Sequence, residues 1–230
     1  MKTNDVLLLA MDTALGACSV AVLDDGRVLA HEHQSMQRGH AEALAPMVER
    51  LMRESGIAFA NLERIAVTTG PGTFTGQRVG LAFARALGVA LAKPVIGVTT
   101  LDAMAEQALL AQPLPFVVAV ADAKRGEIYL GARSGQGQTL IAPELIAIEA
   151  VAARIAPLAD SVGRSVSLAG TASEIVFPLL QAAGLAPIDS LVRQPDAVFV
   201  AKLAVDAPVG QAPRPLYLRA PDAKLPGAPS

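Results

Sequence analysis

The segment 77–91 most constrains the fold of this chain, because it is typical of a helix that is apolar on nearly every side. Small residues recur along it at four-residue spacing, at Gly80, Ala84 and Gly88. Such a stripe lets another helix approach closely. A helix with this pattern has to be covered by other elements. The chain must therefore fold in layers around it.

The composition says what those layers are made of. The 230 residues are 52% hydrophobic but only 3% aromatic, so Ala, Val, Leu and Ile must form the core of an ordered chain. A net charge of −2 leaves no basic surface for a nucleic-acid backbone, and eight aromatic residues leave few platforms for stacking bases. If this protein works on nucleic acid, we expect another chain to hold it.

The sequence predicts a cytoplasmic protein. The single cysteine, Cys18, cannot form an intrachain disulfide and fits a reducing compartment. The apolar run 6–11 is too short for the core of a signal peptide. No stretch reaches the roughly 20 apolar residues of a membrane span.

Hydrophobic periodicity predicts an α/β sheet with a mixed edge in the first half of the chain. The predicted strands cover 6–11, 17–23, 27–32, 62–67 and 95–98, and the predicted helices cover 41–52, 77–91 and 100–110. A turn at 24–26 joins two of the strands as a hairpin. Pro46 either kinks the first helix or marks its true first turn, and Gly56 can end it.

A second unit begins between residues 101 and 115, where prolines punctuate the chain. Its predicted strands cover 116–121, 127–132 and 165–169, and its predicted helices lie around 147–159 and 171–184. Frequent proline after residue 208 predicts an extended arm and a loose tail. We therefore predict two lobes, 1–105 and 106–230.

Asp12 and Thr13 follow the first predicted strand. Ligands of open α/β sheets collect beyond the carboxyl ends of the strands, so an acidic residue and a hydroxyl there could meet a phosphate or its metal. The alternative is that Asp12 only initiates a turn by accepting nearby backbone N–H groups.

A glycine-rich loop precedes the central helix. Gly70, Gly72 and Gly76 permit close backbone approach, and Thr73 and Thr75 add hydroxyls next to a helix N-terminus that could hold an anion. The loop lacks the Lys–Ser/Thr ending of a nucleoside-triphosphate P-loop. The alternative is a structural loop whose glycines only permit tight packing.

The remaining polar residues predict neither a metal site nor a catalytic residue. His40 opens the first helix, but Leu44 stands four residues later, where a metal site would need a second histidine. Asp122 and Glu127 flank a turn and form either a carboxylate pair or an exposed charged hairpin. No nucleophile–histidine arrangement is recoverable.

Five segments together carry a family resemblance that spans nearly the whole chain. They are 7–13, 40–44, 70–80, 122–129 and 215–219. In this order they resemble the TsaB (YeaZ) family of bacterial tRNA threonylcarbamoyladenosine biosynthesis proteins. The glycine-rich loop together with the segment at Asp122 makes the resemblance specific.

The resemblance implies a two-lobed fold of the actin, sugar-kinase and Hsp70 (ASKHA) type, with mixed sheets flanked by helices. It implies a role in placing threonylcarbamoyl on N6 of adenosine 37 in tRNAs that read codons beginning with A. In that pathway TsaC makes threonylcarbamoyl-adenylate, TsaD transfers the group, and TsaB and the ATPase TsaE are its partners. Older descriptions of such proteins as glycoprotease-like come from similarity to TsaD.

The residues fit a noncatalytic partner better than a catalyst. The catalytic relative holds a metal with a histidine pair, of which only His40 has a counterpart here. Gln77 stands where the family has an apolar residue, which puts the contacts of the loop in doubt. The alternatives are an active phosphotransferase that uses Asp12 and the glycine loop, and a glycoprotease-like metallopeptidase. We expect no certain cofactor, with ATP or ADP at the partner interface as the candidate.

The resemblance implies that helices of the first lobe bind TsaD, or a second copy of the chain when TsaD is absent. The residues expected on that surface are His40, Ala43, Met47, Gly80, Ala84 and Gly88. Two alternatives stay open. Met47 could instead belong to the core, and the small-residue stripe could serve packing within the chain.

Overall fold

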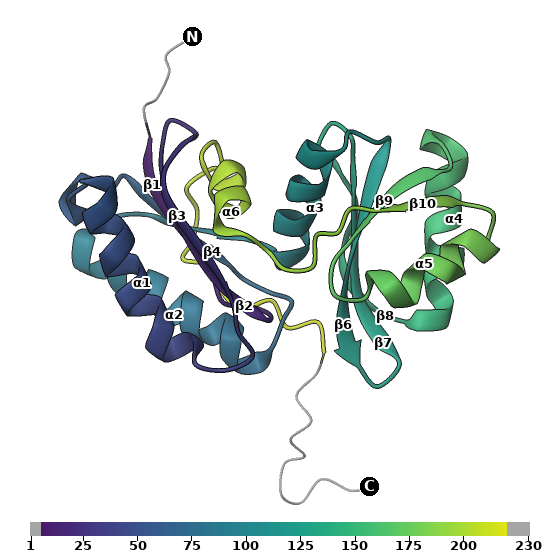
Figure 1. Cartoon of the computed structure of the whole chain (residues 1–230), viewed down its shortest axis with the longest axis horizontal. Coiled ribbons are helices and arrows are strands. Elements are labelled where there is room, and N and C mark those ends of the chain that lie inside the picture. Colours follow the sequence, from purple (N-terminus) through teal and green to yellow (C-terminus); the bar gives the residue numbers. More distant parts are fainter. Residues whose placement is uncertain (1–5, 220–230) are drawn as a thin grey trace, which may run out of the picture.

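The computed structural model describes residues 6–219, which fold into two lobes around two five-stranded mixed sheets (Figure 1). In the first sheet the order is β3-β2-β1-β4-β5, and in the second it is β10-β9-β6-β7-β8. The first sheet contains β1 (Leu7–Asp12), β2 (Ala17–Asp24), β3 (Arg27–Ser35), β4 (Arg64–Thr68) and β5 (Val95–Val98). The second contains β6 (Phe116–Lys124), β7 (Glu127–Ser134), β8 (Thr139–Ala147), β9 (Ser165–Ala169) and β10 (Ala186–Asp189). The predicted α/β class is confirmed.

The helices form three layers around the two sheets. The outer face of the first sheet is covered by α1 (His40–Ser55) and α2 (Phe74–Leu91), and that of the second by α4 (Val151–Val162) and α5 (Ser173–Ala182). Two helices, α3 (Thr100–Ala111) and α6 (Ala197–Ala204), lie between the sheets (Figure 1). Short 3-10 turns cover Phe59–Asn61 and Ile148–Ala150.

The two inner helices are exchanged between the lobes. Helix α3 follows the first sheet in the sequence but packs on β6, β7 and β9 of the second, through residues such as Leu101 and Met104. Helix α6 follows the second sheet but packs on β1 and β2 of the first, through Ala197 and Val200. The boundary that we predicted between residues 105 and 106 falls inside α3.

Three elements in the second half of the sequence escape prediction, and each has a weak local pattern. In β8 most residues are half-buried and the pairing with β7 shifts register, so the strand lacks a clear alternation. The predicted helix around 147–159 starts only at Val151, after this strand. The four residues of β10 include Pro187, and α6 has only eight residues.

The structure decides between the two alternatives predicted for Pro46, a place inside the first helix or a place in its first turn. Pro46 lies inside α1, which begins at His40, so it does not mark the first turn. Gly56 ends the helix as predicted: it takes a left-handed φ of 70°, and its N–H donates to the Arg53 carbonyl.

We predicted that other elements cover the central helix on every side. Within this chain, that prediction is wrong. Helix α2 begins at Phe74, with Thr73 as its N-cap. Its side toward the sheet buries Gly80, Ala84 and Gly88, which accounts for the small-residue stripe. The opposite side exposes a line of apolar residues, including Ala82, Ala86 and Val89, the last 84% exposed.

An ion pair ties the start of α6 to the edge of the first sheet. Asp196, the N-cap of this helix, accepts a hydrogen bond from the Val198 N–H and lies 3.0 Å from Nε2 of His31 on β3. The hydrogen bond to Asp196 is the largest cause that raises the pKa of His31, and it also helps to lower the pKa of Asp196 against the effect of burial. The charged form of His31 is therefore favoured in the folded chain.

We expect this pair to make stability depend on pH. Because the folded pKa of His31 is raised above its unfolded value, the contribution is complete below about pH 6.5 and is lost as the pH rises through the folded pKa. His31→Gln should lower the free energy of unfolding by about 1 kcal/mol near pH 5.5 and by less near pH 8.5. Urea unfolding at both pH values measures this difference. His33→Gln, on the same face of β3, is the control, and an equal loss at both pH values would contradict the prediction.

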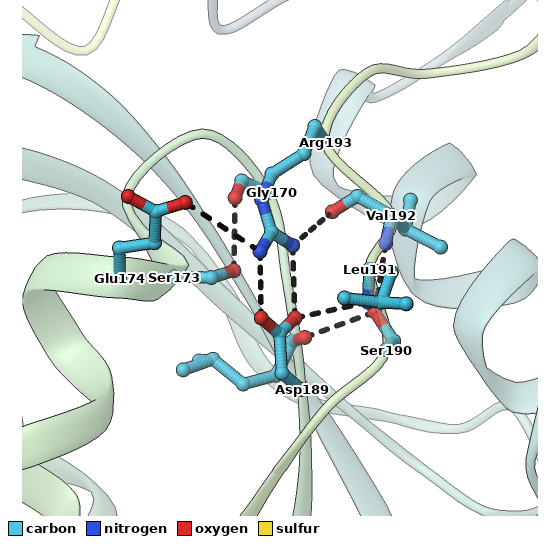
Figure 2. A network of polar contacts seen from close by, with 9 residues as sticks. Gly170, Ser173, Glu174, Asp189, Ser190, Leu191, Val192 and Arg193 are labelled. Atoms are coloured by element: carbon cyan, nitrogen blue, oxygen red, sulfur yellow. Dashed lines mark hydrogen bonds and ion pairs between the residues drawn. The ribbon is translucent and has the colours of Figure 1, made fainter.

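A polar network holds the chain where it leaves the second sheet for α6 (Figure 2). Arg193 donates to both carboxylate oxygens of Asp189, at 2.8 and 2.6 Å. The Gly170 N–H donates to the Val192 carbonyl at 2.7 Å, and the Gly170 carbonyl accepts from the Ser173 hydroxyl at 2.8 Å. The turn after β9 and the crossing segment are therefore fixed to each other.

Candidate functional site

Two cavities open where the lobes meet, and Leu15, Thr73, Asp122 and Lys124 line both of them. The larger one, which we call the cleft, has a volume of about 760 Å³. It lies beside the N-termini of α1 and α2 and reaches Thr171 of the second lobe. The smaller one has about 530 Å³ and is lined by residues of the C-terminal arm, so we call it the arm cavity.

Asp12 is fully buried at the end of β1 and lines neither cavity. Its Oδ1 accepts hydrogen bonds from the Thr68 hydroxyl at 2.6 Å and from the Ala14 N–H at 3.2 Å, while its Oδ2 has no partner among the described residues. Burial is the main cause that raises the pKa of this carboxyl to about 7. The predicted turn-forming role is confirmed by the bond to Ala14, and the carboxyl is shielded from both cavities.

The turn after Asp12 is packed directly against the start of α2. The Thr13 hydroxyl donates to the Gly76 carbonyl at 2.6 Å and accepts from the Gly80 N–H at 3.0 Å. A Cβ on Gly72 would lie 2.3 Å from the Ala14 carbonyl oxygen, and one on Gly76 would lie 2.2 Å from that of Thr13. These glycines are therefore required by tight packing.

The other loop residues divide between the interior and the cleft. Gly70 is buried with a φ of 101°, and its carbonyl accepts from the Thr100 N–H at 2.8 Å. The Thr73 hydroxyl caps α2 by accepting from the Gly76 N–H at 3.1 Å. Thr73 and Thr75 are exposed and line the cleft, so of the predicted phosphate-binding residues these two have hydroxyls within reach of a ligand there.

His40 also lines the cleft, at the first residue of α1. Its Nε2 lies 3.1 Å from the Leu15 carbonyl oxygen, so this nitrogen donates a hydrogen bond. Leu44, one turn later, is buried in the core. The interaction of His40 thus fixes the turn after β1 to the first helix.

The turn between β6 and β7 brings charge to both cavities, but its two carboxylates act separately. Asp122 accepts from the Lys124 N–H at 2.7 Å and from its ammonium at 2.5 Å, and the ammonium is the largest cause that lowers the pKa of Asp122. Glu127 accepts instead from Arg219 of the C-terminal arm. Asp122 and Glu127 therefore belong to a charged hairpin and do not form a carboxylate pair.

Most residues predicted for a partner surface are interior. Met47 and Ala84 are 1% and 0% exposed, and Gly80 and Gly88 are buried with them. Their role in this chain is intramolecular packing, because they lie on the sides of α1 and α2 that face the sheet. His40 and Ala43 are half-exposed.

Sequence reasoning missed a cluster beside the arm cavity. The Arg78 guanidinium lies 3.5 Å from the centre of the Phe74 ring, and its Nε donates to the Tyr217 hydroxyl at 2.7 Å. Phe74 and Tyr217 are stacked, with ring centres 6.0 Å apart, and are 60% and 47% exposed. The partners lie 139 residues apart along the chain, so no local pattern could have joined them.

Two further observations concern ions and membranes. Within residues 6–219, no group of three or more His, Cys, Asp or Glu side chains is placed to hold a metal ion. In the same part of the chain, no helix combines the length and the apolar character needed to cross a bilayer.

Comparison with known proteins places this geometry in a family. Residues 27–203 match the family model of TsaD, tRNA N6-adenosine threonylcarbamoyltransferase. The chain is 40% identical to the tRNA threonylcarbamoyladenosine biosynthesis protein TsaB of Escherichia coli strain K12 over 122 residues, 53% of this chain. It spans about half of that relative, 52% of its length.

Solved structures give the same picture. YeaZ from Pseudomonas aeruginosa is 31% identical, with a TM-score of 0.74, and the match covers 93% of this chain and 100% of that one. A hexokinase of the ROK group from Thermus thermophilus matches 79% of this chain and 92% of its own with a TM-score of 0.50, at 18% identity. The second likeness concerns the fold alone, and it confirms the predicted two-lobed sugar-kinase type.

Proposed function

This chain belongs to the TsaB (YeaZ) family, and from that premise we propose that it is a noncatalytic partner subunit in tRNA threonylcarbamoyladenosine biosynthesis. In this role it assembles with TsaD and TsaE and is needed for the transfer of threonylcarbamoyl to N6 of adenosine 37. The TsaC product and the tRNA are then handled by the complex, and this chain contributes a surface to it.

The main support for the proposal is that Asp12 already forms hydrogen bonds inside the chain. A phosphotransferase of this fold would use this carboxylate on a phosphate or its metal, but here the side chain is fully buried and bonded to Thr68 and Ala14. The closely packed glycines hold the start of α2 against the neighbouring turn. His40, on which a metallopeptidase would depend, is bonded to the Leu15 carbonyl. Both catalytic alternatives therefore rest on residues that already have structural roles.

The exposed side of α2 supports a partner-binding role. Ala82, Ala86 and Val89 form an apolar line on a helix whose sequence predicts cover on every side. Helix α1 lies beside α2 on the same face of the first sheet (Figure 1). An apolar line of this kind on a helix is typical of a surface that another helix covers. We propose this exposed side, and not the buried residues Met47 and Ala84, as the contact with TsaD.

Reconstituted tRNA modification tests the proposal. With TsaC, TsaD and TsaE present, adding this chain should raise threonylcarbamoyl transfer to tRNA by about a hundredfold or more, since TsaD would otherwise lack its activating partner. The chain alone should transfer none. Equal transfer by TsaD and TsaE without the chain would contradict the proposal.

A pair of matched variants in the same assay tests the surface. Ala86→Glu places a charge on the exposed side of α2 and should remove both co-purification with TsaD and the gain in transfer. Ala153→Glu makes the same exchange at an exposed position of α4 and should behave like the unmodified chain. If both variants still bind TsaD, the contact lies elsewhere.

ATP or ADP at the interface with the partner stays a second prediction. Arg38 and Lys124 line the cleft together with Thr73 and Thr75, so cations and hydroxyls are available there. Equilibrium dialysis of labelled ADP against the chain, TsaD and the mixture would locate the nucleotide.

A further inference from the structure

The two lobes are packed against each other along only part of their junction. Helices α3 and α6 contact each other between the sheets, and Leu15 of the first lobe packs among apolar residues of the second. Leu15 also lines the cleft and the arm cavity, so the packed region ends there. Because open cavities contribute no packing, the lobes are held together beyond Leu15 only by segments that span the junction.

The segments that cross between the lobes leave room for rotation. Thr99 alone separates β5 from α3, and residues 190–196 separate β10 from α6. A few loop residues of this kind are enough to absorb the dihedral changes of a hinge. The Gln194 side chain accepts a hydrogen bond from the Gly16 N–H at 2.8 Å. This contact lies on a crossing segment, close to the axis of such a rotation, where it opposes rotation least.

The C-terminal arm is attached to the first lobe through both backbone and side chain. The Leu216 N–H donates to the Thr69 carbonyl at 2.8 Å, and the Tyr217 hydroxyl accepts from Nε of Arg78 at 2.7 Å. Figure 1 shows the last described residues, in yellow, between the two lobes. The arm therefore reaches the junction already fixed to the first lobe.

Arg219 attaches the arm to the second lobe. Its guanidinium donates to the carbonyls of Ala123 and Lys124, at 2.8 and 3.3 Å, and pairs with the carboxylate of Glu127. These three residues belong to β6 and β7 beside their connecting turn. Within residues 6–219, Arg219 is the one arm residue with a hydrogen bond or an ion pair to that lobe. The polar attachment on this side thus depends on one side chain.

From these contacts we propose that the C-terminal arm restrains the angle between the two lobes, and that Arg219 completes this restraint. Without the Arg219 contacts the arm stays on the first lobe through Leu216 and Tyr217, while the second lobe is released. The lobes then rotate about α3 and α6, which changes the width of both cavities. The inference concerns the isolated chain and does not depend on the proposed role beside TsaD.

A distance measurement between the lobes tests the restraint directly. Spin labels are attached to cysteines that replace two exposed residues, Glu49 on α1 of the first lobe and Ala153 on α4 of the second. The single native cysteine, Cys18, is fully buried, so the labels react at the introduced positions. Pulsed electron paramagnetic resonance of the full-length chain should give one narrow distribution of distances. A broad distribution in this chain would contradict the restraint.

Variants of the doubly labelled chain assign the restraint to Arg219. Arg219→Gln should widen the distance distribution at least about twofold, because the second lobe is then free to rotate. Glu127→Gln removes the ion pair but keeps the carbonyls of Ala123 and Lys124, so it should widen the distribution less. The matched control is Arg164→Gln. Arg164 also contacts a carboxylate and a carbonyl, but both lie within the second lobe, so the distribution should not change.

Thermal unfolding separates this role from a general contribution to stability. The pair of Arg219 with Glu127 is partly exposed, so Arg219→Gln should lower the melting temperature by less than about 4 °C. A residue that only stabilised the fold would lower the melting temperature and leave the distances between the lobes unchanged. Distributions that stay narrow in both Arg219→Gln and Glu127→Gln, or that widen equally in Arg164→Gln, would overturn the proposal.

Discussion

Replacement of Gly170 by alanine is expected to destabilise the second lobe by at least about 3 kcal/mol. A Cβ at this position would lie 1.9 Å from the carbonyl oxygen and 2.8 Å from the carbonyl carbon of Val120, in the central strand β6. The φ of 114° is also one that L side chains rarely adopt. Since the clash is with backbone, either β6 or the polar network of Figure 2 has to shift.

Thermal unfolding measures this effect. For a chain of this size, a loss of about 3 kcal/mol lowers the melting temperature by roughly 6–12 °C. The matched control is Gly210→Ala, because Gly210 has open space where a Cβ would stand and needs no left-handed φ. Equal melting temperatures of the two variants would contradict the packing described around Gly170.

Asp12→Asn is expected to make the chain more stable than the unmodified protein above about pH 7. Asparagine keeps an oxygen for the bonds from Thr68 and Ala14 and never ionises. The unmodified carboxyl has a folded pKa of about 7, raised mainly by burial from its ordinary value of 3.8. The gain should be close to zero near pH 4 and about 3–4 kcal/mol near pH 8.

The sign follows from proton binding. A carboxyl whose pKa is raised on folding holds its proton more tightly in the folded chain, so the folded state binds more protons between the two pKa values. The stability contributed by the neutral form of Asp12 is complete below about pH 4 and is lost as the pH rises toward 7. The charged form then has to be buried at a cost.

Urea unfolding from about pH 4 to pH 8 measures the difference between variant and unmodified chain, which cancels the titration of all other groups to first order. Asp206→Asn, at an exposed position after α6, is the control and should show no such trend. If the difference in stability stayed constant across this range, Asp12 would be ionised and paired at every pH measured, which would contradict the prediction.

Much of the fold could be predicted because the deciding signals are local. The turn at 24–26 joins β2 and β3 with positive φ at Asp25 and Gly26, as its sequence indicates. The apolar face of α1 and the end of this helix at Gly56 follow from spacing alone. The elements that escaped, β8, β10 and α6, are short or half-buried, and their existence depends on long-range packing that a sequence window does not contain.

The candidate site was less predictable for the same reason. Sequence reasoning marked Asp12, Thr13 and the glycines of the loop, but could not tell a ligand site from tight packing. The deciding contacts, such as that between the Thr13 hydroxyl and Gly76, join residues 63 positions apart. The cluster of Arg78 with Tyr217 bridges most of the chain, so only folding brings it together.

The exchange of α3 and α6 between the lobes makes the two halves of the chain depend on each other. Each sheet is sealed on its inner side by a helix encoded with the other sheet. A gene fragment for either half would therefore yield a product with one apolar sheet face open to water, at risk of aggregation. We therefore expect neither half to fold stably when it is expressed without the other.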